Sequence, residues 1–201
     1  MITDVEALRA TYGQPMERAV AKQLSRLDPH CVRFLELSPM VMIATCDGER
    51  VDVSPKGDGP GFAKPDGEGA VLIPDWPGNN RLDGYENILR NPQAGLIFLI
   101  PGLKETLRIN GHASIHDEEA VRARFETRGR LPITVLRVEA EEVFLHCAKA
   151  FLRSRLWDPA SWPEKGELPS PGQMFKDHMQ LPGMIVEDAD AMHARYEPTL
   201  Y

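Results

Sequence analysis

The sequence MVMIATCDGERVDVSPKGDGPGF, residues 40–62, decides the fold. Its first part, Val41–Thr45, is an apolar run that ends before Asp47-Gly48, and Val51–Ser54 then alternates apolar with polar residues. Two such runs on either side of a glycine-containing turn predict a β-hairpin with a half-buried second strand. The segment Ser54–Gly61 follows and combines a hydroxyl group, an ammonium group and three glycines. We interpret it as a loop whose backbone N–H groups approach a ligand closely.

A second loop of this kind, Pro77–Arg81, leads into a predicted helix at Asp83–Arg90. It brings together the guanidinium group of Arg81, the amide of Asn80 and the N-terminus of a helix. These groups are typical of a phosphate site, because both an arginine and the free N–H groups of a helix end bind anions. The alternative is that Arg81 only pairs with a nearby aspartate such as Asp83 at the surface.

The two loops and the later sequence NILRNPQAGLIFL, residues 87–99, resemble the pyridoxamine 5′-phosphate oxidase-like superfamily of FMN-binding split barrels. Within it, the chain resembles a bacterial branch of FMN-dependent enzymes whose reactions are mostly undefined. The resemblance extends over residues 34–157. It implies a mainly β fold with α, a six-stranded antiparallel split β-barrel, with FMN as the cofactor. It also implies a homodimer with flavin sites at the subunit interface.

The pattern of strands and helices leads to the same fold class. Six short strands interrupted by helices favour a closed antiparallel barrel over a doubly wound parallel sheet. We expect one domain over residues 1–201, with a helical N-terminal cap at 1–37, a barrel core at 38–157 and a C-terminal arm at 158–201. The cap is predicted to contain a helix from Pro15 to Leu24, and another whose N-cap is Asp28.

Composition limits the possible partners and location. The net charge is −7 and the pI about 5.4, which disfavours binding to nucleic acid or to anionic lipid. No apolar run reaches the roughly 20 residues that a membrane span needs. The three cysteines are widely spaced and contain no C-x-x-C motif, which argues against a disulfide scaffold and a thiolate zinc site. We therefore expect a cytoplasmic protein without a metal site.

The resemblance implies a set of flavin-binding residues. They are Ser54, Pro55, Lys56, Gly57, Asn80, Arg81, Lys149, Arg153 and Trp157. In this interpretation residues 54–57 line the flavin ring or its ribityl chain, and residues 80 and 81 hold the phosphate. The last three residues lie at the end of the barrel core and complete the flavin site of the second subunit. The alternatives are an ordinary solvated turn at 54–57 and a solvated helix carrying Lys149 and Arg153.

The function that this implies is an FMN-dependent oxidoreductase acting on a small molecule, with NAD(P)H as the reductant. The oxidase that names the superfamily binds a phosphorylated substrate through basic and aromatic residues that cannot be traced here, so its own reaction is not carried over. The sequence also identifies no catalytic acid or base. The alternative function is a non-catalytic protein that binds flavin, haem or deazaflavin.

Overall fold

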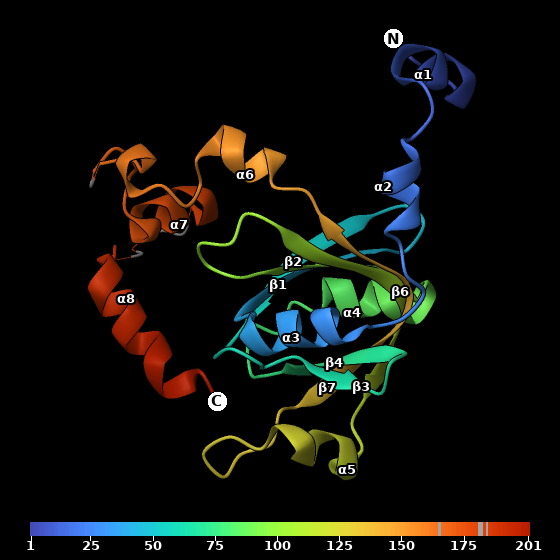
Figure 1. The fold of residues 1–201 in the computed structure, drawn as a ribbon. Coiled ribbons are helices and arrows are strands. Elements are labelled where there is room, and N and C mark those ends of the chain that lie inside the picture. Colours follow the sequence, from blue (N-terminus) through green and yellow to red (C-terminus); the bar gives the residue numbers. More distant parts are fainter. Residues whose placement is uncertain (165, 181–182, 184) are drawn as a thin grey trace.

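Figure 1 shows the chain as a computed structural model, which describes residues 1–164, 166–180, 183 and 185–201. The strands are β1 (Met40–Cys46), β2 (Val51–Gly57), β3 (Lys64–Asp66), β4 (Ala70–Asp75), β5 (Gln93–Leu99), β6 (Thr106–His116) and β7 (Thr134–His146). The α-helices are α1 (Val5–Tyr12), α2 (Glu17–Ala21), α3 (Pro29–Leu37), α4 (Asp83–Arg90), α5 (Glu119–Arg122), α6 (Lys149–Ser154), α7 (Pro171–Met179) and α8 (Ala189–Tyr196). The 3-10 helices are η1 (Ala123–Phe125), η2 (Pro159–Ser161) and η3 (Glu197–Thr199).

The strands form one antiparallel sheet in the order β2-β1-β5-β6-β7-β4-β3. The mainly β fold with α is confirmed, but two details of the prediction are wrong. The sheet has seven strands and not six. The prediction missed the short β3 because it lies within a segment rich in glycine and charged residues, which is typical of a loop. The barrel is also not closed, because within the described residues no strand pairing joins the two edge strands, β2 and β3.

The predicted hairpin is confirmed, and it is longer than expected. β1 and β2 pair from Met40↔Gly57 to Cys46↔Val51. Residues 54–57 therefore belong to a strand, and the predicted loop starts only at Asp58. Pro55 fits here because β2 is an edge strand, where a missing N–H group is tolerated.

The core lies inside the curved sheet. Leu96, Phe98, Leu107 and Ile109 from the central strands are fully buried. The helix α3 covers this core with Leu35, and its N-terminus is as predicted, with the Asp28 carboxylate accepting a hydrogen bond from the Cys31 N–H at 2.8 Å. Alternate residues of β6 point inward, because successive side chains of a strand lie on opposite faces of the sheet.

The N-terminal helices extend away from the sheet. α2 is shorter than the predicted helix, because Leu24 instead forms an isolated bridge with Val143 of β7, with a backbone hydrogen bond in each direction. Neither α1 nor α2 has a buried residue. None of the helices that the structure describes is both long and apolar enough to cross a lipid bilayer.

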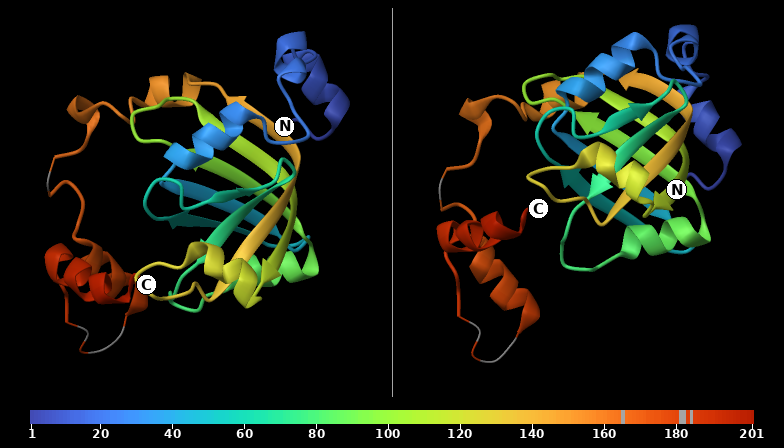
Figure 2. Two further views of the ribbon diagram at one scale, coloured as in Figure 1. Left: turned by 60° about the horizontal axis from the view of Figure 1, so that its bottom comes forward. Right: turned by 90° about the horizontal axis from the view of Figure 1, so that it is seen from below.

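The segment after β7 leaves the barrel and returns to it. Figure 2 shows in both views that the chain from α6 to α8 runs beside the sheet and that its end lies next to the loop that follows α5. α7 packs against α8, and Gly172 of α7 lies so close to the residue before the α8 cap that a Cβ atom would be 2.0 Å from the carbonyl oxygen of Glu187. The end of the arm therefore lies beside the barrel.

Candidate functional site

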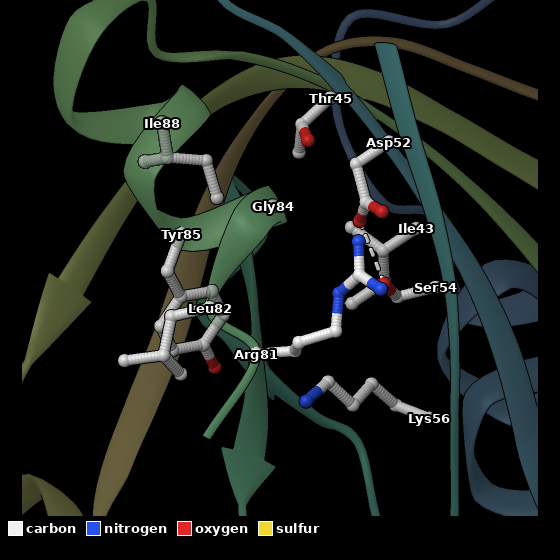
Figure 3. A pocket seen from close by; sticks show the side chains of 10 residues that line it. All are labelled: Ile43, Thr45, Asp52, Ser54, Lys56, Arg81, Leu82, Gly84, Tyr85 and Ile88. Atoms are coloured by element: carbon white, nitrogen blue, oxygen red, sulfur yellow. Dashed lines mark hydrogen bonds between the residues drawn. The ribbon is translucent and has the colours of Figure 1, made fainter. Parts of the chain in front are cut away.

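A hollow lies between the inner face of β2 and the helix α4, and Figure 3 shows its walls. We name it the inner hollow. It is lined by Ile43, Thr45, Asp52, Ser54, Lys56, Arg81, Leu82, Gly84, Tyr85 and Ile88. Because side chains alternate along a strand, three polar residues of β2 share this face. A glycine at position 84 lets the helix approach closely, since a Cβ atom there would lie 2.8 Å from Asp52 Oδ2.

A second hollow adjoins the first at the loop before α4, and we name it the loop hollow. It is lined by Lys56, Asp75, Trp76, Gly78, Asn79, Asn80, Arg81, Leu82, Tyr85, Ile133 and Thr134. Four of these residues also line the inner hollow. The cavity volumes are about 40 Å³ for the inner hollow and about 170 Å³ for the loop hollow. Ligand pockets usually measure about 300–1,000 Å³, so one chain does not enclose a complete nucleotide cofactor here.

The structure brings together four of the residues predicted from the sequence. Ser54, Lys56 and Arg81 line the inner hollow, and Asn80 lines the loop hollow beside it. Two other predicted residues of the same strand, Pro55 and Gly57, do not line either hollow. The positions of Pro55 and Gly57 lie on the opposite, exposed face of β2.

Arg81 is mostly exposed and forms an ion pair with Asp83, with a distance of 2.9 Å from Nε to Oδ2. This is the surface pairing that the sequence left open as the alternative. The same guanidinium group also points into the inner hollow, toward Asp52 and Ser54 (Figure 3). An exposed ion pair of this kind contributes little stability, so an anionic ligand can replace Asp83 as the partner of Arg81 at little cost. Arg81 is therefore available to an anionic ligand.

The N-terminus of α4 adds backbone donors to this wall. The N-cap residue is Leu82, which makes no side-chain hydrogen bond to the helix. The first N–H groups of a helix have no partner within it, so they are free to bind an anion. Asn80, just before the helix, has a positive φ of 57°, and the side chain of Asn79 accepts a hydrogen bond from the Arg81 N–H at 3.0 Å. The loop is thus held in a defined conformation in front of the helix.

A network of charges crosses the mouth of the hollows. The ammonium group of Lys56 donates a hydrogen bond to the carboxylate of Asp75 and lies 5.5 Å from the centre of the Tyr85 ring. Burial raises the pKa of the Tyr85 hydroxyl group above its ordinary value, and the negative charge of Asp75 adds to this shift. Tyr85 is therefore a neutral hydroxyl group at physiological pH. The site combines cations, a neutral donor and carboxylates.

Sequence reasoning missed several residues of these walls. They are Thr45, Asp52, Asp75, Tyr85 and Thr134. Asp52 could have been found, because it precedes Ser54 and Lys56 at the two-residue spacing of one strand face. Its carboxylate accepts a hydrogen bond from the Ser54 hydroxyl group at 2.6 Å. Asp75 and Thr134 lie on β4 and β7, which only the folded sheet brings close to β2.

Two buried polar atoms in the loop hollow lack a partner. Among the described residues, Trp76 Nε1 and Thr134 Oγ1 are buried and make no hydrogen bond. Buried polar groups are nearly always paired, and an exception indicates a missing ligand, ion or water. Together with Lys56, Arg81 and the helix N–H groups, these atoms match the needs of a phosphate-bearing cofactor with polar ring edges. The residues present therefore fit a flavin nucleotide.

The remaining predicted residues lie elsewhere. Lys149 and Arg153 are exposed on α6, which stands apart from α4 in Figures 1 and 2. Trp157 follows this helix and stacks on Phe151 at 5.8 Å, while its indole N–H donates to the carbonyl oxygen of Leu103 at 2.8 Å. Within one chain these residues do not reach either hollow. Their predicted role therefore requires a second subunit.

The part of the chain that contains the strands of the sheet matches a known protein family. A family model described as pyridoxamine 5′-phosphate oxidase matches residues 27–147, more than half of the chain. The chain belongs to this family. The match runs from just before α3 to just after β7, so this family domain contains both hollows and leaves α1, α2 and the C-terminal arm outside. The resemblance predicted from the sequence is confirmed.

Several solved structures are similar to the chain. HupZ of Group A Streptococcus is 19% identical, with a TM-score of 0.48, over 59% of this chain and 93% of the other. A putative pyridoxamine 5′-phosphate oxidase from Lactobacillus delbrueckii is 19% identical, with a TM-score of 0.47. The match covers 61% of this chain and 98% of the other. The FAD binding protein from Mycobacterium smegmatis is 16% identical, with a TM-score of 0.43. The match covers 61% of this chain and 97% of the other. No curated protein matches the sequence significantly.

Proposed function

We propose that the chain is an FMN-dependent oxidoreductase that acts on a small molecule, with NAD(P)H as the reductant. Membership of the family supports a flavin-related function. One observation of the site carries the proposal. The uncapped N-terminus of α4 opens where the two cations Lys56 and Arg81 border the same hollow. Free N–H groups and cations in this arrangement suit a phosphate group.

Each wall would have a distinct task in holding the cofactor. Arg81, Asn80 and the first N–H groups of α4 would bind the phosphate. Ser54 and Lys56 would lie along the ribityl chain and the ring edge, where a cation stabilises the anionic reduced ring. Bound FMN supplies the redox chemistry. The protein residues would orient the cofactor and exclude water from one of its faces.

We further propose that the cofactor site is completed in a homodimer. The outer face of the sheet supports this, because it exposes the apolar side chains of Val51, Val53 and Ile97. Apolar side chains exposed on one face of a sheet suit a subunit interface. The small volume of the hollows also agrees with a site that a second chain completes. In that arrangement Lys149, Arg153 and Trp157 would reach the flavin of the partner. A cytoplasmic location stays a prediction from the sequence.

A single substitution tests the phosphate site. Arg81→Ala is expected to weaken FMN binding by about 1.5–3 kcal/mol, the scale of a hydrogen bond to a charged group, which is roughly 10–150-fold in Kd. The measurement is the quenching of flavin fluorescence on titration with protein. Arg90→Ala is the matched control, since Arg90 is at the other end of α4 and also pairs with acidic residues, Asp47 and Glu86. Equal affinity of Arg81→Ala and wild type would contradict the phosphate site.

A second measurement separates an enzyme from a binding protein. The protein loaded with FMN is mixed anaerobically with NADH or NADPH, and the flavin absorption is followed. Bleaching of the flavin bands with a defined second-order rate supports the oxidoreductase. A stable yellow complex that neither nucleotide reduces would favour the non-catalytic alternative. Titrations with haem and with a deazaflavin under the same conditions test the two other cofactors that the alternative names.

A further inference from the structure

The side chain of Tyr201 joins three separate segments of the barrel. Its hydroxyl group donates a hydrogen bond to Asp58 Oδ1 at 2.5 Å. The ring meets the indole of Trp76 edge to face, with 5.1 Å between ring centres and an angle of 85°. The guanidinium group of Arg128 lies 5.0 Å from the ring centre, and Arg130 donates a hydrogen bond to the main chain of Tyr201. We name these four partners the Tyr201 socket.

The Tyr201 socket adjoins the loop hollow through Trp76, which belongs to both. Asp58 comes two residues after Lys56 on β2, and Trp76 follows Asp75 on β4. Trp76 itself lines the loop hollow, and its buried indole N–H is one of the two unpartnered polar atoms there. It also begins the loop that carries Asn80 and Arg81. A side chain that holds Trp76 therefore influences the position of the phosphate-binding residues.

The backbone of the socket is specialised for this contact. Arg128 has a φ of 53°, in the left-handed region that L residues rarely adopt, and it precedes Gly129 in a tight turn closed by Thr127 and Arg130. Asparagine or glycine would suit this conformation better than arginine. Strained conformations of this kind are found where a side chain has a specific task. Here it covers the ring of Tyr201.

We propose that Tyr201 is a positioning residue. Through it the C-terminal arm holds Trp76 and the loop Pro77–Arg81 in the conformation that binds the ligand. The identity of this ligand as FMN rests on the proposed function. The arm lies outside residues 27–147, which match the family model. By linkage, a ligand in the loop hollow also strengthens the docking of the arm.

The first experiment measures the docking of the arm without added flavin. The chain has three tryptophans, and Trp157→Phe with Trp162→Phe leaves Trp76 as the only emitter. In this parent, Tyr201→Ala is expected to expose Trp76 and raise its Stern–Volmer constant for acrylamide. Arg128→Gly is expected to do the same, although glycine relieves the turn. Tyr196→Ala is the control, because this ring lies on the same arm but contacts Arg195. Unchanged quenching in Tyr201→Ala and Arg128→Gly would overturn the proposal.

The second experiment measures coupling to the cofactor in the otherwise wild-type chain. Tyr201→Ala is expected to raise the Kd for FMN by about fivefold, within the usual range for coupled sites. Tyr201→Phe keeps the ring and loses only the hydrogen bond to Asp58, so its effect should be smaller. Greater quenching with no change in Kd would show that the arm covers Trp76 without positioning the loop, which contradicts the proposal. If the wild type binds no FMN, the proposed function fails, while the quenching result still decides whether Tyr201 holds Trp76.

Discussion

The ammonium group of Lys56 on β2 and the carboxylate of Asp75 on β4 meet across the mouth of the barrel, although the two strands are not neighbours in the sheet. Asp75 is largely buried, and its side chain keeps only 11% of its exposure, against 32% for Lys56. A carboxylate buried to this extent needs a partner to offset its lost hydration. The pair therefore links two distant strands at the site where a ligand would enter.

Removal of one partner from this pair is expected to destabilise the fold. Lys56→Met leaves the carboxylate of Asp75 without its cation, and we expect the free energy of unfolding to fall by about 1–3 kcal/mol. The measurement is urea denaturation at pH 7. Lys104→Met, at an exposed lysine, should change stability by less than about 0.5 kcal/mol.

The double variant Lys56→Met/Asp75→Asn separates the pair from the surrounding structure. Because no unpaired carboxylate remains, it should be more stable than Lys56→Met alone. If the losses of the two single variants simply add, the two groups do not interact, and the proposed link between β2 and β4 is wrong.

A glycine on β6 is expected to tolerate no side chain. The register of β6 against β7 shifts at Asn110/Gly111, and a Cβ atom on Gly111 would lie 1.7 Å from the carbonyl oxygen of Glu139. Since this obstacle is backbone, the strands must separate to admit it. Gly111→Ala should lower stability by at least about 2 kcal/mol in thermal or urea denaturation. Gly69→Ala is the control, because a Cβ atom there meets nothing within 4 Å. Equal stability of these two variants would contradict the packing described for β6 and β7.

The loss of protein stability at acidic pH should depend on Asp66. Hydrogen bonds from Arg124 first, and then from Arg137, lower the pKa of this carboxyl group. A lowered folded-state pKa means that the stabilisation is present above the unfolded pKa of about 3.9 and is lost as the pH falls through the folded value. Asp66→Asn should therefore destabilise the protein at pH 7, and the difference from wild type should disappear at lower pH.

Urea denaturation between pH 7 and pH 3 measures this convergence. In a background of Arg124→Ala and Arg137→Ala, the same Asp66→Asn change should cost less at pH 7, because the two hydrogen-bond donors are gone. A difference between Asp66→Asn and wild type that is the same at pH 7 and pH 3 would exclude the ion pairs as its cause.

The sequence predicted those features that depend on neighbouring residues. The α4 helix has the predicted bounds Asp83–Arg90, and the Asp28 cap is where the pattern placed it. The turn at Asp47-Gly48 joins two strands in the predicted hairpin. Capping, helical periodicity and strand alternation act over a few residues, so a single sequence contains their signals.

Features that depend on distant partners were predicted less well. Leu24 is not helical because it pairs with Val143, which lies far along the chain. The short β3 forms because β4 offers it a partner, through pairs such as Pro65↔Val71. Closure of the barrel was wrongly expected, because the hydrogen-bond pairing of the edge strands is a property of the assembled sheet. Local patterns do not contain these partners.

The sequence by itself determined the family, the hairpin, the helix behind the candidate phosphate loop and the residues Ser54, Lys56, Asn80 and Arg81 beside the hollows. Only the tertiary structure decided that Asp75 faces Lys56, that Thr134 completes the wall and that Tyr201 reaches Trp76. The physical reason is range. Side chains on one strand or one helix turn have fixed relative positions, whereas contacts between segments 19 to 143 residues apart depend on how the whole sheet curves.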